Sequence, residues 1–184
     1  MKSTLILLTI LPLLAYSQGI SAGSSYLRFP LTARSASLGE TLVAEPGSVG
    51  SAGINPANLY RTTGGEIILS HTSWIQDVQT EYFSAGYAMP FGTVGVSLLS
   101  SSIPNIEIRD APGQPLGTFS ARSAYVQALY ATSVDSTVRI GVSGKFLYDK
   151  LYVEESSGYA FDVGILYESP IPGLLARSCG YKRN

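Results

Sequence analysis

Residues 138–149 read VRIGVSGKFLYD, and this stretch decides the fold that we expect. Its side chains fall into two alternating sets. One set is apolar or small, and the other set holds all the charged residues of the stretch. The first set is Val138, Ile140, Val142, Gly144, Phe146 and Tyr148, and the second is Arg139, Gly141, Ser143, Lys145, Leu147 and Asp149. Successive side chains of a strand point to opposite faces, so the pattern predicts a β-strand with one apolar face.

Residues 158–168, GYAFDVGILYE, repeat this pattern. The apolar set is Tyr159, Phe161, Val163, Ile165 and Tyr167, and the opposite set is Ala160, Asp162, Gly164, Leu166 and Glu168. Both stretches have about 11 residues and carry aromatic side chains near the ends of the apolar face. This arrangement is typical of a tilted strand that crosses a membrane between two aromatic girdles.

Four earlier stretches also alternate: residues 66–74, 80–89, 93–101 with a continuation to 108, and 118–131. In residues 118–131 the two faces differ less in polarity, so the sequence does not decide which face of this strand is the apolar one. Short connections at 90–92 and 133–137 alternate with longer ones at 111–117 and 150–157. Outer-membrane barrels place short turns in the periplasm and long loops outside. We therefore predict an all-β fold, an antiparallel transmembrane β-barrel with six strands over residues 64–173.

The N-terminus and the composition agree with export. Residues 1–17 predict a signal peptide, because Lys2 precedes an apolar run at 5–14 and a small-residue cleavage site at 15–17. No later window has the roughly 18 apolar residues of a membrane helix. Only 14% of residues are charged, the net charge of −1 gives no indication of a nucleic-acid partner, and the single cysteine excludes an internal disulfide.

A soluble periplasmic β-sandwich is the alternative, since its strands would alternate in the same way and bury their apolar faces against a second sheet. The signal peptide, the low charge and the segregation of long and short connections favour the barrel.

Residues 18–63 have no strand pattern. Residues 34–60, RSASLGETLVAEPGSVGSAGINPANLY, are rich in small residues and end in a segment where Pro56 keeps Asn55 out of the helical region. Such a kinked segment is too short for a core of its own and too irregular to face lipid. We expect it to pack against, or inside, the barrel.

Four blocks of the sequence are informative when taken together. They are residues 29–40 (FPLTARSASLGE), 54–59 (INPANL), 141–148 (GVSGKFLY) and 160–167 (AFDVGILY). In this order they resemble the ARAAGMGGA, NPAGL, GVTLKYLY and AFDLGLLY blocks of the PorV/PorQ family of outer-membrane proteins, within the FadL-like barrels. The chain departs from the family at residues 45–47, EPG, which replace an acidic pair, and at Ile54, which replaces an aromatic residue.

The resemblance implies a barrel of about fourteen strands with the N-terminal segment as a hatch in the lumen. It assigns Arg34, Gly39, Asn55 and Pro56 to the hatch motif. It further implies a place in the outer membrane and a role in type IX secretion, with secreted cargo proteins and the cell-surface attachment machinery as partners. A FadL-like channel for hydrophobic small molecules is the alternative that it leaves open.

The C-terminal residues 174–184 (LLARSCGYKRN) lose the alternation, and we expect them to be a tail outside the barrel. Six strands cannot close a single-chain barrel, which needs about eight. We therefore expect the reading frame to be incomplete or shifted after residue 173, or else the chain to close by oligomerising.

No catalytic, cofactor or metal site is expected. His71 is the only histidine, and no spacing distinguishes a serine–histidine site, with Ser70 or Ser73, from a histidine that faces the lumen or the interface. One histidine and one cysteine far apart make no metal site. The charged residues Arg139, Lys145, Asp149, Asp162 and Glu168 are predicted to pair inside the lumen, with holding the hatch or lining a permeation path as the alternative.

Overall fold

The computed structural model describes residues 25–61, 64–109, 113–168 and 175–183, the last range without its side chains. The predicted signal peptide, residues 1–17, lies outside these ranges.

Within these ranges, seven strands form one antiparallel sheet in chain order. They are β1 (Gly65–Ser73), β2 (Gln79–Met89), β3 (Gly92–Ile108), β4 (Gly117–Ser133), β5 (Val138–Leu151), β6 (Glu154–Glu168) and β7 (Leu175–Arg183). Over the described residues the sheet is not closed, because β1 and β7 are its two edges. The prediction of an all-β fold with six antiparallel strands before residue 168 is confirmed.

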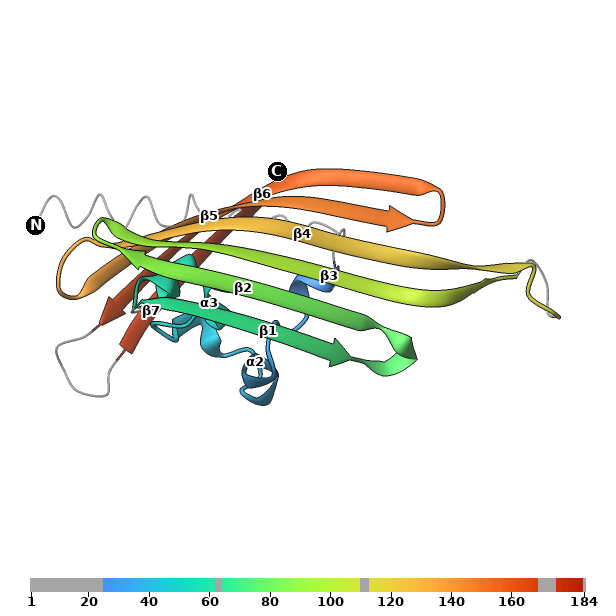
Figure 1. Cartoon of the computed structure of the whole chain (residues 1–184), viewed down its shortest axis with the longest axis horizontal. Helices are drawn as coiled ribbons and strands as arrows, with labels where there is room; N and C mark the ends of the chain where they lie inside the picture. The colour runs from blue at the N-terminus through green and yellow to red at the C-terminus, as the bar shows by residue number, and fades with distance from the viewer. Residues whose placement is uncertain (1–24, 62–63, 110–112, 169–174, 184) are drawn as a thin grey trace, which may run out of the picture.

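The hairpins differ between the two ends of the sheet (Figure 1). The β1–β2, β3–β4 and β5–β6 connections lie at one end, which we call the long-hairpin end, and the β3–β4 hairpin projects furthest. The β2–β3 and β4–β5 turns lie at the opposite, short-turn end. In β3 the pairing with β4 shifts between Ile103 and Ile106, where Pro104 precedes Asn105 at a φ of 55°. A bulge accommodates a proline that cannot donate to the ladder.

Two expectations about the C-terminal half are wrong. Residues 150–157 are not a long loop, because β5 continues to Leu151 and β6 begins at Glu154, with Lys150 Nζ 2.5 Å from Glu155 Oε1 across the hairpin. Residues 175–183 are not a strand-free tail, because β7 pairs with β6 from Leu175–Glu168 to Arg183–Ala160. In both places backbone pairing extends the sheet where side-chain alternation has stopped, since ladder hydrogen bonds do not require an apolar face.

The two faces of the sheet have different surroundings. One face, the inner face, carries the N-terminal segment and buries Tyr82, Leu99, Tyr125, Leu129 and Leu166. The opposite, outer face leaves its large apolar side chains exposed, including Leu69 at 78% and Val163 at 56%. The pattern also settles the orientation of β4, since Tyr125, Gln127 and Leu129 point inward and Val126 points outward.

The N-terminal segment consists of short helical turns. They are η2 (Ser25–Arg28), α2 (Ala33–Ser37), η3 (Leu42–Ala44), α3 (Val49–Ala52) and η4 (Pro56–Arg61). Thr32 caps α2 by accepting from the Ser35 N–H at 3.1 Å, and Ser48 caps α3 by accepting from the Gly50 N–H at 3.2 Å. These turns are too short to be stable alone. Their order therefore comes from packing on the sheet.

Candidate functional site

The turn formed by Asn55, Pro56 and Ala57 lies directly on the backbone of β5 and β6. Gly141 and Gly164 are cross-strand partners beneath it. A Cβ on Gly141 would overlap the Pro56 carbonyl carbon and the Ala57 nitrogen, and a Cβ on Gly164 would overlap the Asn55 side chain. The missing side chains thus create the space that this turn occupies.

The same arrangement continues toward β2 and β3. A Cβ on Gly86 would lie 2.7 Å from Val49 Cγ1 and 2.9 Å from Leu59 Cδ1, and one on Gly95 would lie 3.2 Å from Leu59 Cδ2. Leu59 is only 1% exposed. Together the four glycines form a trough across the inner face, which we call the glycine trough: Gly86, Gly95, Gly141 and Gly164.

Two buried asparagines organise the segment above the trough. Asn55 Nδ2 donates to the Val43 carbonyl at 2.8 Å and to the Ile165 carbonyl of β6 at 3.4 Å. Its Oδ1 accepts from the Ala57 N–H at 3.1 Å. Asn58 Nδ2 donates to the Leu42 carbonyl at 3.0 Å. Because both residues are fully buried, these bonds replace the water that the two amide nitrogens and Asn55 Oδ1 lose, whereas Asn58 Oδ1 has no partner among the described residues.

A second set of polar contacts holds α3. The Val49 carbonyl accepts from the Ser84 hydroxyl at 3.1 Å and from the Tyr82 hydroxyl at 3.5 Å. The Val49 N–H donates to Glu66 Oε2 at 3.1 Å. One residue of the segment is thereby bonded to both β1 and β2.

The start of the segment makes an apolar contact instead. Tyr26 and Leu31 pack with Tyr82, Leu99 and Tyr125 in a buried cluster that Leu147 and Ala160 complete. The inner face at this level is therefore apolar and covered.

Four of the five predicted lumen residues lie in pairs on the inner face. Lys145 Nζ is 2.9 Å from Asp162 Oδ2, which also accepts from the Ser143 hydroxyl at 2.9 Å. Arg139 Nη2 is 3.8 Å from Glu168 Oε2. Within the described residues Asp149 forms no ion pair.

Arg139 also contacts the N-terminal segment, because its guanidinium lies over the Tyr60 ring at 5.0 Å from the centroid. A cation over an aromatic face is attracted by the ring electrons. The Lys145–Asp162 pair is instead connected to neighbouring strands of the sheet. Ser143, which donates to Asp162, accepts from the Gln127 side-chain amide of β4 at 2.8 Å.

The predicted hatch residues are not brought together. Asn55 and Pro56 lie in the glycine trough, whereas Arg34 is exposed and pairs with Glu45 at the edge of the segment. Gly39 follows α2 at a φ of 60°, a conformation that favours glycine. These two residues shape the segment rather than contact the sheet.

Sequence reasoning missed the trough glycines and the hydroxyls of Tyr82 and Ser84. The available signal was the run of small residues on the predicted inner faces of neighbouring strands.

In the described part of the chain, no helix is both long and apolar enough to cross a membrane. The same residues contain no group of three histidine, cysteine or acidic side chains that would hold a metal ion. No known protein-family profile matches the chain. No curated protein matches it, and no solved structure matches it either.

Proposed function

We propose that this protein is a wall of an outer-membrane β-barrel whose N-terminal segment is a hatch, and that it serves protein export to the cell surface through type IX secretion. The observation that carries the membrane assignment is the outer face. It is apolar over several successive rows of six paired strands, although nothing in the described residues covers it.

The cross-strand register defines these rows. One row runs Leu69, Phe83, Leu98, Val126, Phe146 and Tyr159, and the next runs Ile67, Ala85, Val96, Ala128, Gly144 and Phe161. A third runs Gly65, Tyr87, Val94, Tyr130, Val142 and Val163. Contiguous apolar patches this large are rare on proteins that stay in water. Contact with acyl chains removes the cost of exposing them.

Aromatic side chains bound the apolar band. Phe91 and Tyr130 stack near the short-turn end, with centroids 6.5 Å apart, and Phe146 and Tyr159 pack at 5.3 Å nearer the long-hairpin end. On β6, the eight-residue interval from Tyr159 to Tyr167 spans about 27 Å along the strand. With a tilt near 45° this is about 20 Å of depth, close to the apolar band of known barrels.

The inner face argues against the sandwich. A sandwich buries each sheet against another sheet. Here the inner face is covered by the irregular N-terminal segment, and the apolar outer face is the one left open. A segment seated on the glycine trough is what a hatch inside a barrel requires.

The export role rests on the four sequence blocks that resemble the PorV/PorQ family. One observation favours a second candidate, a channel for hydrophobic small molecules. Tyr82, Leu99, Tyr125 and Leu147 make part of the inner face apolar, and an apolar lumen suits an apolar solute.

Fractionation tests the membrane assignment. The mature chain should sediment with outer membranes after a carbonate wash and require detergent for release. A chain that stays dissolved after membranes are removed without detergent would overturn the proposal.

Deletion of the gene then separates the two roles. Loss of cargo from the cell surface with unchanged uptake of a long-chain fatty acid supports export. The opposite result would replace export with the channel.

A further inference from the structure

A serine, a histidine and a carboxylate meet on the outer face near the long-hairpin end. Ser73 and His71 are two residues apart on β1, so both point outward. Ser73 Oγ lies 3.3 Å from His71 Nε2, and His71 Nδ1 lies 3.7 Å from Glu81 Oε1 of β2. His71 and Glu81 are cross-strand partners. The two ring nitrogens thus face a hydroxyl on one side and a carboxylate on the other.

This order of groups is that of a nucleophile, a general base and a residue that orients the base. With a carboxylate at Nδ1, the neutral imidazole keeps its proton there and leaves Nε2 free to accept from the serine. Contacts of this kind are commonly long in a protein without substrate and shorten when substrate binds.

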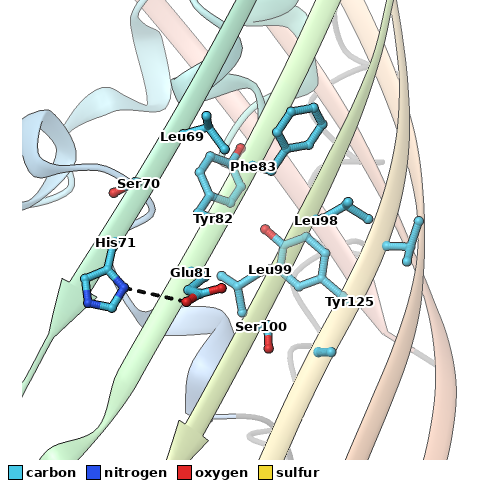
Figure 2. A pocket seen from close by; sticks show the side chains of 12 residues that line it. Leu69, Ser70, His71, Glu81, Tyr82, Phe83, Leu98, Leu99, Ser100 and Tyr125 are labelled. Carbon is cyan, nitrogen blue, oxygen red and sulfur yellow. Dashed lines mark ion pairs between the residues drawn. The ribbon is translucent and has the colours of Figure 1, made fainter.

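An open hollow of about 630 Å³ is lined by His71 and Glu81 (Figure 2), and Ser73 lies one cross-strand row beyond His71 on β1. The four large apolar side chains that line it from the outer face occupy the row next to His71: Leu69, Phe83, Leu98 and Val126. Ser100 and Ala124 lie in the row of His71 itself, and their small side chains leave the space open. The volume is in the range of sites for small ligands, and the lining suits a hydrocarbon chain.

The distribution of charge places the groups at the edge of the apolar band. On β1 to β6, the acidic, basic and histidine side chains of the outer face lie toward the long-hairpin end, namely His71, Glu81, Glu107, Arg122, Lys150 and Glu155. The outer-face rows nearer the short-turn end contain no acidic, basic or histidine side chain on these strands. His71 is one row from the apolar band, about 7 Å along the strand. In a membrane this is the depth at which lipid ester bonds lie between headgroup and acyl chain.

We propose that Ser73, His71 and Glu81 form a hydrolytic site for the carboxylic esters of long-chain lipids, with the acyl chain in the hollow. The membrane depth in this inference rests on the proposed function, whereas the geometry of the three side chains does not.

The reaction uses water and no other co-reactant. Ser73 Oγ attacks the ester carbonyl carbon as its proton passes to His71 Nε2, and the bond to the leaving alcohol breaks as His71 returns that proton to the alcohol oxygen. A water molecule then gives a proton to His71, and its oxygen forms a bond to the acyl carbon. The fatty acid leaves, and Ser73 Oγ takes the proton back.

An aromatic contact holds the end of β1 that carries the site. Trp74, which follows the nucleophile, stacks on Phe29 of the N-terminal segment with centroids 5.8 Å apart. This contact anchors the end of the strand.

The test uses the full mature chain purified in detergent. Wild type should release p-nitrophenol faster from the palmitate ester than from the butyrate ester, and a fluorophosphonate probe should label Ser73. Ser73→Ala should abolish labelling and lower the rate at least about a thousandfold. The control Thr72→Ala removes a neighbouring hydroxyl that points to the inner face and should leave both signals unchanged.

Glu81 is a positioning residue, so its removal should act on turnover. Glu81→Gln should lower kcat about tenfold to a hundredfold without changing KM, because the base loses its orientation while the hollow keeps its shape. Val126→Trp should fill the hollow and raise KM for palmitate only.

Absence of labelling and hydrolysis in a chain that remains folded in membranes would overturn the hydrolytic site and leave the proposed function standing. Equal rates on the two esters would overturn the lipid substrate. A chain that fractionates as soluble but is labelled at Ser73 would overturn the membrane role and support the triad.

Discussion

Replacing Gly141 by alanine should lift the N-terminal segment off the sheet. The new Cβ would overlap backbone atoms of Pro56 and Ala57, which cannot rotate away as a flexible side chain would. The turn must therefore move by roughly 1 Å, and overpacking of this kind costs about 1–3 kcal/mol. At about 2 kcal/mol, the population of the undocked segment rises about thirtyfold.

Gly164→Ala acts on the same turn through Asn55, so the two substitutions should not be additive. Once the turn has lifted for one Cβ, the second meets less resistance, and the double variant should cost less than the sum. Gly144→Ala is the matched control on β5. Its Cβ would point to the outer face, where the nearest atom is Phe161 Cε1 at an ordinary contact distance of 3.5 Å.

Hydrogen–deuterium exchange of the protein in lipid nanodiscs measures the effect. Peptides covering residues 49–61 should exchange about thirtyfold faster in Gly141→Ala, while peptides from β2 to β4 keep their protection. If residues 49–61 exchange hydrogen at the same rate in Gly141→Ala and Gly144→Ala, the glycine trough is not what holds the hatch on the sheet.

Three further outcomes follow from the same contacts. Val163→Arg puts a cation into the apolar band and should cost about 2–4 kcal/mol in urea unfolding from lipid vesicles, whereas Ser157→Arg near the charged end should cost less than about 1. Asp162→Ala leaves Lys145 buried without its partner and should cost about 3–5 kcal/mol, much of which an apolar replacement of both residues should recover. Backbone and hydroxyl hydrogen bonds in the β4–β5 turn hold the pKa of Asp135 below its usual 3.8. The folding stability that ionised Asp135 contributes is therefore complete above pH 3.8 and is lost as the pH falls through the lower pKa of the folded state. Asp135→Asn should flatten this acid-side loss in thermal unfolding curves recorded against pH.

The strands were predictable because each carries its own evidence. Alternation within residues 138–149 identifies β5 and its faces without knowledge of any neighbour. The same pattern on the following strand identifies β6. Only the orientation of β4 could not be predicted, because Tyr125 and Leu129 on one face are as apolar as Val126 and Tyr130 on the other. In the structure, burial beneath the N-terminal segment identifies the face of Tyr125 and Leu129 as the inner one.

The glycine trough and the hydrolytic site depend on register between strands, which no single stretch encodes. Gly141 reads as a weak position of one strand until it is known to face Gly164 beneath Pro56. His71 and Glu81 are ten positions apart, and only the pairing of β1 with β2 makes them partners. The ends of β5 and β6 were also missed, because pairing beyond the apolar band leaves no periodic pattern.

The inner and outer faces of the same strands meet opposite requirements, and glycine serves them differently. On the inner face a glycine lets another backbone approach, as at Gly141, where the turn replaces a side chain as the filling of the sheet. On the outer face Gly144 has only an ordinary contact with the Phe161 ring, so an added methyl group would find room there. A strand with both kinds of glycine is constrained on one face and tolerant on the other. This difference is expected when a fixed protein segment covers one face and fluid lipid covers the other.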